Sequence, residues 1–467
     1  MDPRAGPSEQ PLVLLPLPTG LPHRLGEVLG HDGTWSPDGR QITYAKGNEL
    51  FVCRPDGAES RRLVAAAGTI TWPRWSPDGA TLRFTVHNAK TGSNSLWETR
   101  ADGTHLHPLL PGWNNPPDEC SGNWTPDGKY YVFQSTRNGK TNIWVRREKQ
   151  GLFRGGPSEP ALLTSGGMNS LAPVMSLDGK QIFVIGAIPR GELVRYDSNS
   201  QFVPYLSGIS AAEVDFSKDG KWVTYVDYPE GTLWRSKSDG SERLQLTFPP
   251  MLAFLPRWSP DGKRIAFAAS VPGQRWKVYT VSAEGSTPRQ VTQGEGDEGD
   301  VGWSVDGNSL VFGSMSTTEG RPAIHLLDLR THEISTLPGS EGLFSPRWSP
   351  DGRYIAAVVA AASNEFMLYD FATKKWAKLA EIEAGWGPNW SRDGRYIYLD
   401  DLSLATEPVF VRVRISDGRI EKVASLKGLR RAIVQGGTWA GLTPDGSPLV
   451  LRDTGSQEIY ALDVELP

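Results

Sequence analysis

Apolar and β-branched residues occur along this chain in short runs, and turn-forming residues separate the runs. One stretch shows the whole pattern, because it predicts four successive strands at Leu255–Ser259, Arg264–Ala268, Trp276–Val281 and Arg289–Thr292. Pro260–Lys263 connects the first two: proline fixes φ, aspartate accepts backbone N–H bonds and glycine adopts a positive φ. No helical period of apolar residues competes with this pattern. The chain is therefore predicted to be all-β.

The turn between the first two strands carries a phrase that recurs along the whole chain. Its clean form is Trp-Ser-Pro-Asp-Gly, as at Trp258–Gly262, and ten copies or near-copies occur at a mean spacing of about 45 residues. Strand-rich units with a fixed period of about 40–50 residues are typical of β-propellers. We therefore expect a β-propeller built from ten four-stranded blade repeats. The anchor aspartates that mark the copies are Asp38, Asp78, Asp127, Asp178, Asp219, Asp261, Asp306, Asp351, Asp393 and Asp445.

One division of the ten repeats gives two rings. The segment 148–160 is irregular and rich in glycine and proline, and seven anchor aspartates follow it. Residues 161–467 would then form a seven-bladed propeller, and residues 27–160 would form three blades of an incomplete ring. Residues 1–26 would supply partial blade strands that could close a ring. We favour this division because seven blades close a ring on their own.

The other division is a single ten-bladed ring over residues 12–467. The last repeat is short of strands after its anchor aspartate, whereas Leu12–Pro16 and Pro22–Leu25 resemble the third and fourth strands of a blade without a beginning. Pairing these N-terminal strands with the last repeat would remove two open sheet edges at once.

Two residue types of the repeat suggest how blades contact one another. A large flat tryptophan at the start of the phrase suits the gap between neighbouring blades. The triplet Pro-Arg-Trp places Arg74, Arg257 and Arg347 immediately before this tryptophan. Because neighbours on a strand point to opposite faces, each arginine is expected to face the adjacent blade and to form a buried ion pair with an acidic residue there. Anion binding near the central channel is the alternative.

Acidic residues supply the candidates for chemistry. Asp297, Glu298 and Asp300 end the run Glu-Gly-Asp-Glu-Gly-Asp, and such oxygen clusters suit Ca²⁺, although the spacing is not that of an EF-hand. A solvated loop is the alternative. Asp32, Glu213 and Asp300 lie shortly before their anchor aspartates and are candidates, together with the three arginines, to line the channel.

Composition and motifs argue against several functions. The net charge of −4 and the pI of about 6.1 argue against a nucleic-acid-binding surface. No run of 18 apolar residues predicts a membrane span. Cys53 and Cys120 are too few for a four-cysteine zinc site, and two free thiols are favoured over a disulfide. No Gly-x-Ser-x-Gly elbow or phosphate loop occurs, so we expect neither catalysis nor a cofactor beyond the Ca²⁺ considered above.

The ten registered repeats resemble the TolB-like, or WD40-like, β-propeller family over roughly residues 12–467. Trp124–Arg137 (WTPDGKYYVFQSTR) and Leu337–Ile355 (LPGSEGLFSPRWSPDGRYI) are also similar to the propeller region of acidobacterial winged-helix regulatory proteins. That resemblance implies a signalling or transcription-regulatory context. This chain shows neither a winged helix nor a membrane span, so we expect no direct binding to nucleic acid.

These observations lead to one principal hypothesis and two alternatives. The chain is expected to be a non-enzymatic sensor or scaffold that binds a protein or peptide, with a small molecule as the alternative ligand. The TolB-like resemblance implies a periplasmic or cell-envelope location, and the cytoplasm is the alternative. A metal-dependent propeller enzyme of the hydrolase or lyase type, and an inactive peptidase-type propeller adaptor, are the alternative functions.

Overall fold

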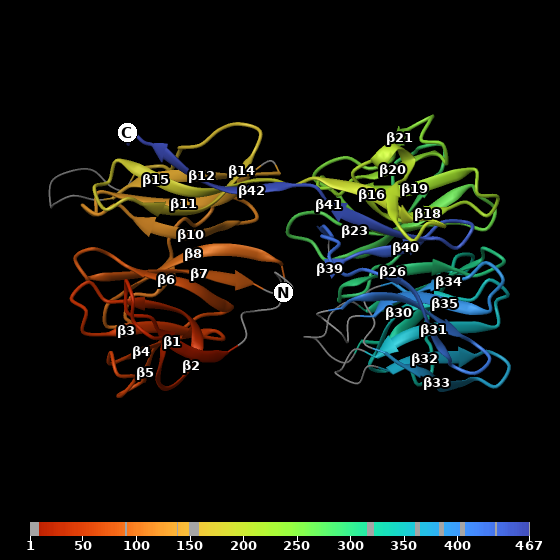
Figure 1. Ribbon diagram of the computed structural model, residues 1–467, viewed down its shortest axis with the longest axis horizontal. Helices are drawn as coiled ribbons and strands as arrows, with labels where there is room; N and C mark the ends of the chain where they lie inside the picture. Colours follow the sequence, from red (N-terminus) through yellow and green to blue (C-terminus); the bar gives the residue numbers. More distant parts are fainter. Residues whose placement is uncertain are drawn as a thin grey trace. The chain divides into compact units, whose positions relative to one another are not determined.

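The computed structural model describes residues 9–88, 91–137, 139–148, 158–314, 322–359, 365–382, 387–401, 407–434 and 437–466, and it is almost entirely β (Figure 1). Apart from one two-stranded hairpin, the described strands form ten antiparallel sheets of three to five strands, and each anchor aspartate lies in a turn between two neighbouring strands of one sheet. We number the sheets 1 to 10 in the order of their anchor aspartates. The all-β propeller fold expected from the repeats is confirmed. None of the described segments forms a helix long and apolar enough to cross a membrane.

Unit 1 comprises residues 1–188 and 456–467, and its described part holds sheets 1 to 4. With hydrogen-bonded neighbours given next to each other, the strands are β1 (Gln10–Leu14), β2 (His23–Trp35), β3 (Ile42–Lys46), β4 (Glu49–Cys53) and β5 (Arg61–Ala65) in sheet 1; β6 (Thr69–Trp75), β7 (Thr81–Asn88), β8 (Ser93–Arg100) and β9 (His107–Pro108) in sheet 2; β10 (Glu119–Trp124), β11 (Tyr130–Arg137), β12 (Lys140–Arg147) and β13 (Ala161–Leu162) in sheet 3; β14 (Asn169–Met175), β15 (Gln181–Ile188) and β42 (Ser456–Asp463) in sheet 4.

Unit 2 comprises residues 189–455 and holds sheets 5 to 10. The strands are β18 (Ala211–Phe216), β19 (Trp222–Asp227), β20 (Leu233–Lys237) and β21 (Leu244–Gln245) in sheet 5; β22 (Leu252–Trp258), β23 (Arg264–Ser270), β24 (Lys277–Ser282) and β25 (Arg289–Gln290) in sheet 6; β26 (Glu298–Trp303), β27 (Ser309–Ser314), β28 (Ile324–Asp328) and β29 (Ile334–Thr336) in sheet 7; β30 (Leu343–Trp348), β31 (Tyr354–Val359), β32 (Glu365–Asp370) and β33 (Lys375–Glu381) in sheet 8; β34 (Asn389–Trp390), β35 (Tyr396–Asp401), β36 (Val409–Arg414) and β37 (Ile420–Ser425) in sheet 9; β40 (Ala440–Leu442), β41 (Pro448–Asp453), β16 (Gly191–Tyr196) and β17 (Phe202–Pro204) in sheet 10. The 3₁₀ turn η1 (Leu206–Gly208) and the hairpin of β38 (Ile433–Val434) and β39 (Gly437–Thr438) complete the unit.

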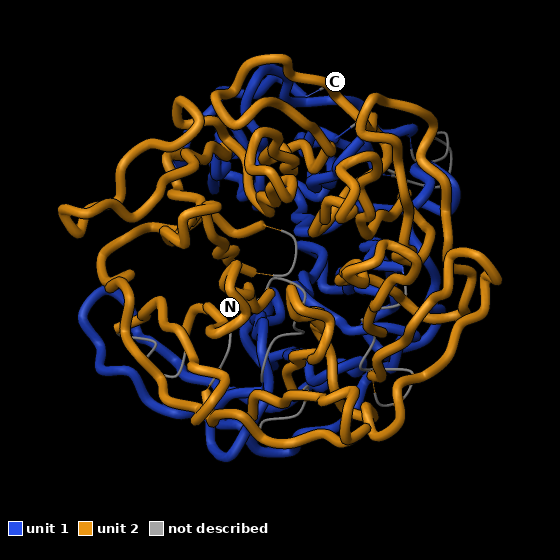
Figure 2. The backbone as a smooth tube through the Cα atoms, turned by 90° about the vertical axis from the view of Figure 1, so that its right-hand side faces the viewer, with its two compact units in different colours: residues 1–188, 456–467 blue, residues 189–455 orange. Residues whose placement is uncertain are grey.

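Sheets 5 to 10 close on themselves as a ring (Figure 2, orange). A separate buried apolar cluster joins each sheet to the next one, and the last cluster joins sheet 10 back to sheet 5, where Leu449 packs with Val223. The turns also meet in sequence: Pro444 of sheet 10 lies 3.7 Å from the position that a Cβ on Gly220 of sheet 5 would occupy. Unit 2 is thus a six-bladed propeller in which each sheet is covered on both faces.

Sheets 1 to 4 form a series rather than a ring. Apolar clusters join sheet 1 to sheet 2, sheet 2 to sheet 3 and sheet 3 to sheet 4. Within the described part of unit 1, no such cluster joins sheet 4 to sheet 1. The outer face of sheet 1 is partly covered by its own N-terminal hairpin, since Leu25 and Val28 of β2 pack on Ile42 and Tyr44.

Repeats 4 and 10 exchange their third strands. After β15 the chain leaves unit 1, and β16 pairs with β41 of the last repeat, with Leu193 opposite Leu451. In return, β42 of the last repeat pairs with β15, with Ile459 opposite Ile185. Each repeat thereby supplies outer strands to the other, which is why the last repeat looks incomplete in the sequence. Two connections of the chain join the units as a result.

The domain boundaries differ from those expected. The units divide at residues 188/189 and 455/456 rather than at 160/161, because β42 ties sheet 4 to unit 1. The N-terminal strands do not complete the last repeat, because β1 pairs with β2 in sheet 1. A single ring over residues 12–467 does not form either, because sheets 5 to 10 already close on one another.

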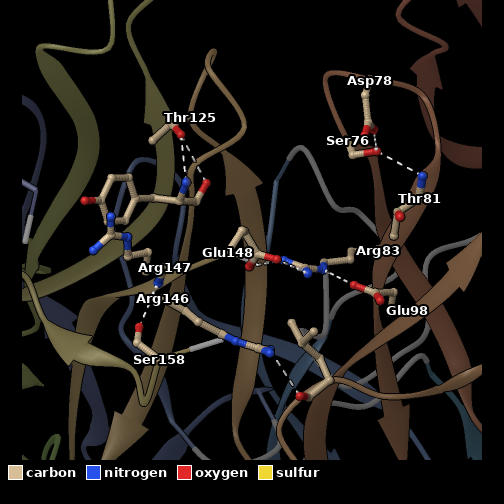
Figure 3. A network of polar contacts seen from close by, with 12 residues as sticks. Ser76, Asp78, Thr81, Arg83, Glu98, Thr125, Arg146, Arg147, Glu148 and Ser158 are labelled. Carbon is tan, nitrogen blue, oxygen red and sulfur yellow. Dashed lines mark hydrogen bonds and ion pairs between the residues drawn. The ribbon is translucent and has the colours of Figure 1, made fainter. Parts of the chain in front are cut away.

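Local hydrogen bonds explain why the phrase turns the chain. In sheet 2, the Ser76 hydroxyl donates to Asp78 Oδ1 at 2.6 Å and accepts the N–H of Thr81 at 2.9 Å (Figure 3). Eight other repeats contain the same hydroxyl-to-aspartate bond at 2.5–2.7 Å, and Thr443 and Asp445 make it in the last one. The donated hydroxyl bond lowers the pKa of Asp78, so this turn is built around a carboxylate.

The tryptophans of the phrase cross the gap between sheets, as expected. The indole N–H of Trp75 donates to Thr43 of the preceding sheet at 3.1 Å. Those of Trp303 and Trp390 donate to the backbone carbonyls of Arg257 and Arg347, again in the preceding sheet, at 3.0 and 3.1 Å. These three tryptophans therefore face the sheet before their own, whereas the indole N–H of Trp348 donates to the Gly352 carbonyl in its own turn at 3.1 Å.

Candidate functional site

A β-bulge marks the same point in the innermost strand of eight repeats. Six residues before the anchor aspartate, the backbone takes a left-handed conformation with φ between 46° and 57°, and the strand pairing shifts register there. Bulges redirect side chains within a sheet. The residues at this position are Asp32, Trp72, Ser121, Ala172, Glu213, Leu255, Asp300 and Ser345. The three acidic channel candidates therefore occupy one structural position of the repeat.

Asp300 and Arg347 form a buried ion pair between neighbouring sheets. Asp300 lies on β26 and Arg347 on β30, both side chains are almost fully buried, and Arg347 Nη1 contacts Asp300 Oδ1. The same nitrogen donates to the Pro346 carbonyl at 2.8 Å. Burial lowers the pKa of Arg347 to about 10, although Asp300 acts in the opposite direction. This pair has the arrangement expected of the Pro-Arg-Trp triplet.

Asp215 and Arg257 extend this pair into a cluster of four charges. Asp215 Oδ2 accepts the N–H of Trp258 at 2.7 Å. Burial raises the pKa of Asp215, whereas Arg257 and Arg347 act to lower it. The four side chains come from the inner strands of sheets 5, 6, 7 and 8, and we call them the charge centre of unit 2. Two carboxyl groups and two guanidinium groups lie close enough to shift one another's pKa, so opposite charges offset part of the cost of burying each other.

Sequence reasoning missed Asp215, although a signal existed. Asp215 lies four residues before its anchor aspartate, which is the position of Arg257 and Arg347 in their own repeats. Glu213 is also buried, and its Oε2 accepts the N–H of Leu255 in the next sheet at 2.6 Å.

The remaining channel candidates belong to unit 1. Asp32 Oδ2 accepts the N–H of Trp72 at 3.2 Å and lies 3.3 Å from His31 Nδ1. Burial acts to raise the pKa of Asp32, but the bonds from His31 and Trp72 outweigh it, and the pKa is lowered. The Arg74 guanidinium donates to the Pro73 carbonyl at 2.9 Å, in the same way as its two counterparts. The six candidates are thus divided between two units.

The three metal-ligand candidates contact three different cations. Asp297 lies 3.4 Å from Arg275, and Glu298 lies 3.1 Å from Lys277. Asp300 contacts Arg347. Their oxygens do not converge, and nowhere in the described segments do three His, Cys, Asp or Glu side chains form a group that could hold a metal ion. The arrangement therefore does not fit a Ca²⁺ site.

A second charged network supports unit 1 (Figure 3). The buried Arg83 on β7 donates to Glu98 at 2.7 Å and to both oxygens of Glu148 at 2.8 and 2.7 Å. Its guanidinium also lies over the rings of Trp124 and Tyr131, with centroid distances of 4.7 and 4.4 Å. A planar guanidinium can make these fork-shaped bonds and this stacking contact at once, which a lysine cannot. Arg83 thereby links sheets 2 and 3.

A cavity of about 350 Å³ opens beside this network, between the outer strands of sheet 2 and the segment 109–118. Backbone and side-chain bonds hold that segment: Leu109 N–H donates to Leu96 at 2.7 Å, and the Asn114 amide donates to the Thr136 carbonyl at 3.2 Å. We call this cavity the Trp97 pocket. Its lining residues are Ser95, Leu96, Trp97, Pro108, Leu110, Pro111, Gly112, Asn114, Asn115, Pro117 and Glu119.

Glu119 is the titratable group of the Trp97 pocket. It begins β10 and is buried, and this burial raises its pKa to about 7. The Asp118 N–H and the Asn114 side chain bond to the carboxylate but only partly oppose the shift. A perturbed carboxyl in a cavity with apolar walls is typical of a binding site. No motif surrounds Glu119 in the sequence, because its pKa depends on how segment 109–118 covers it.

Replacing Glu119 by glutamine is expected to stabilise the protein at alkaline pH. The folded chain keeps the Glu119 proton up to a pKa of about 7, whereas the unfolded chain releases it near 4.5. The free energy of unfolding of the wild type should therefore fall as pH rises through that interval, by an amount on the order of 2 kcal/mol. Urea unfolding of wild type and E119Q at pH 4 and pH 8 should show a difference only at pH 8. The exposed Glu341→Gln is the control, and an equal difference at both pH values would contradict the prediction.

Comparisons with known proteins agree with the repeat pattern. The family model described as the TolB beta propeller domain matches residues 32–213 and 196–439. A TolB homolog of Chlorobium chlorochromatii is 29% identical over 210 residues, which are 43% of this chain and 46% of that protein. The uncharacterized peptidase YuxL of Bacillus subtilis is 26% identical over 215 residues, or 44% of this chain and 30% of the relative. The chain thus spans less than half the length of these relatives. The crystal structure of TolB from Acinetobacter baumannii is 19% identical, with a TM-score of 0.40, and the match covers 63% of this chain and 82% of that one.

Proposed function

Because this chain belongs to the family of TolB β-propeller domains, we propose that it is a non-enzymatic binding module that recognises a protein or peptide partner. It would act as the sensing or scaffolding part of a bacterial regulatory or cell-envelope system. A TolB homolog among the relatives supports that context, and with it a periplasmic location. In this proposal the charge centre of unit 2 is structural, since its carboxyl groups interact with its own arginines rather than with a ligand.

The Trp97 pocket carries the proposal. Trp97, Leu96 and Leu110 provide apolar surface, while Asn114 and Glu119 place an amide and a carboxyl at its edge. Sites for small groups of a ligand combine apolar walls with a few fixed polar groups in this way. An extended peptide would insert an apolar side chain between the walls and hydrogen-bond through its backbone to the polar pair.

The anchoring of segment 109–118 supports the same ligand. Arg146 donates to the Leu109 carbonyl at 3.3 Å, and Trp113 packs edge-on against Trp144 with 4.9 Å between the ring centroids. A binding loop held by its scaffold loses little conformational freedom on binding. Segment 109–118 therefore has the property expected of a binding loop, which is anchorage to rigid strands.

A peptide-selection experiment tests the proposal. Peptides selected against the full chain from a displayed random library should share an apolar residue, and their affinity should fall about tenfold in Trp97→Ala. Trp72→Ala is the matched control, because Trp72 is an exposed tryptophan of the same unit that does not line the pocket. Selected peptides that bind Trp97→Ala and wild type equally would overturn the assignment of the pocket, and a selection that enriches no peptide would overturn the proposed function.

A further inference from the structure

Sheet 4, the last sheet of the series in unit 1, has one face that is not packed against another sheet of that unit. Five residues after the anchor aspartate, or four in the last repeat, whose turn is one residue shorter, the side chain on the strand after the turn faces the following sheet. In nine repeats this side chain is at most 8% exposed, whether or not it is polar; these are Thr43, Arg83, Val132, Thr224, Ala266, Val311, Ala356, Tyr398 and Leu449. Phe183 of sheet 4 has the same position and is 39% exposed. Within the described part of unit 1, no sheet therefore covers this face of sheet 4.

Further apolar residues surround Phe183. Val174 lies opposite Phe183 on β14, and Ile459 on β42 occupies the same face; both are exposed. In the turn of sheet 4, Leu177 stands where most repeats have proline, and it is 97% exposed. We call Val174, Leu177, Phe183 and Ile459 the tail face. Contiguous exposed apolar residues of this kind mark interaction surfaces.

Sheet 1 has the complementary unmatched face at the other end of the series. Trp35 has the position of Trp75, which bonds to the preceding sheet, but Trp35 is 47% exposed. The nine counterparts of Trp35 in the other repeats are all buried or half-buried. An apolar groove of about 490 Å³ lies beside Trp35, lined largely by Leu12–Pro16 and Leu25. We call Trp35 and this groove the head face.

The turns show the same two open ends. In unit 1, Pro37 lies 3.8 Å from the position of a Cβ on Gly79, and sheets 2 and 3, and sheets 3 and 4, make the same contact through Pro77 and Pro126. Gly39 of sheet 1 has no atom within 4 Å. Leu177, at the other end, is the residue that would make this contact with a following turn. The tail face therefore carries a turn residue, Leu177, without a following turn to contact, and the head face carries a turn glycine, Gly39, without a preceding turn beside it.

We propose that two copies of this chain associate through unit 1, with the tail face of each copy packed on the head face of the other. At the turns and at Trp35, the interface would repeat the contact that already joins sheets 1 and 2, sheets 2 and 3, and sheets 3 and 4. Over the rest of the head face, the tail face would pack on the N-terminal hairpin that covers Ile42 and Tyr44. A two-fold axis satisfies both pairs of faces at once, so the assembly closes and no filament grows. Four sheets from each copy make a ring of eight, which lies within the range of about four to eight blades that propellers use.

A second copy is the occupant that the observations favour. The head and tail faces occupy equivalent repeat positions, so this chain carries both partners of the contact. Phe183 and Ile459 supply side chains for the groove, and Leu177 supplies the turn contact to Gly39. Covering these residues also removes exposed apolar surface from both copies, which favours association.

Sedimentation velocity of the full chain over a wide range of concentration tests the proposal. The wild type should form a dimer, and Phe183→Asp should weaken dimerisation about 100-fold, because a charge would enter an apolar contact. Leu177→Asp should also weaken it, and its exposed position in a turn leaves the fold of sheet 4 intact. Ile420→Asp, at a similarly exposed isoleucine on β37 of unit 2, is the matched control and should not change it. A wild type that stays monomeric, or a dimer that the two tail-face variants leave unchanged, would overturn the proposal.

Cross-linking distinguishes the closed ring from other dimers. Leu177→Cys protein mixed with Arg40→Cys protein should give a dimer with a short bis-maleimide, because Arg40 follows Gly39 in the turn of the head face. Neither variant alone should cross-link through its new cysteine, and wild type controls for the native Cys53 and Cys120. The double variant should stop at a covalent dimer. Cross-linking of Leu177→Cys with itself, or a ladder of larger species from the double variant, would overturn the closed head-to-tail arrangement.

Discussion

Replacing Asp300 by asparagine is expected to lower the free energy of unfolding of unit 2 by about 3 kcal/mol, because it leaves the buried Arg347 without its counter-charge. Asparagine tolerates the left-handed φ of 54° at this bulge, so the loss reports the charge rather than backbone strain. Urea unfolding should show the loss, and hydrogen exchange should place it in sheets 7 and 8. Asp417→Asn is the control, since Asp417 pairs with Arg414 at the surface and should change stability by less than about 0.5 kcal/mol.

A double-mutant cycle gives this prediction a second measurement. Arg347→Met alone should cost a similar amount, because it leaves Asp300 buried without a cation. The combined variant should lose clearly less than the sum of the two single losses, since neither charge then remains buried alone. Additive losses would mean that Asp300 and Arg347 do not stabilise each other.

Replacing Arg83 by methionine is expected to destabilise unit 1 by about 3 kcal/mol. The change leaves Glu98 and Glu148 without their shared cation and removes the stacking of the guanidinium on Trp124 and Tyr131. Arg83→Lys should lose about half as much, because lysine keeps the charge but not the bidentate bonds. Urea unfolding combined with hydrogen exchange in sheets 2 and 3 is the measurement.

An exposed arginine provides the comparison for Arg83. Arg353 pairs with Asp370 at 3.2 Å and lies 4.8 Å from the centroid of the Tyr354 ring, so it has the same kinds of contact at the surface. Arg353→Met should change stability by less than about 1 kcal/mol, since solvent already competes for both contacts. Equal losses from Arg83→Met and Arg353→Met would show that burial does not strengthen the Arg83 network.

The candidate site was only partly predictable from the sequence. Arg347 could be assigned to a buried ion pair with an adjacent sheet from the Pro-Arg-Trp triplet, but its partner, Asp300 of the preceding sheet, could not be named from strand alternation alone. Asp297 and Glu298 were grouped with Asp300 as metal ligands because they are close in sequence, yet each contacts a cation on a different residue. Glu119 could not be found, because its pKa is raised by burial in the folded chain and no sequence motif marks that burial.

The sequence by itself determined the ten sheets and their turns. Bonds such as that between Ser76 and Asp78 span only two residues, and they form whatever lies around them. Only the tertiary structure decided how the ten sheets are grouped. The edge of β15 could accept either β16 or β42, because the third strands of all repeats present the same backbone groups. Closure of six sheets in unit 2 selects the exchange, since the pairing of β16 with β41 completes the last sheet and leaves β42 for β15.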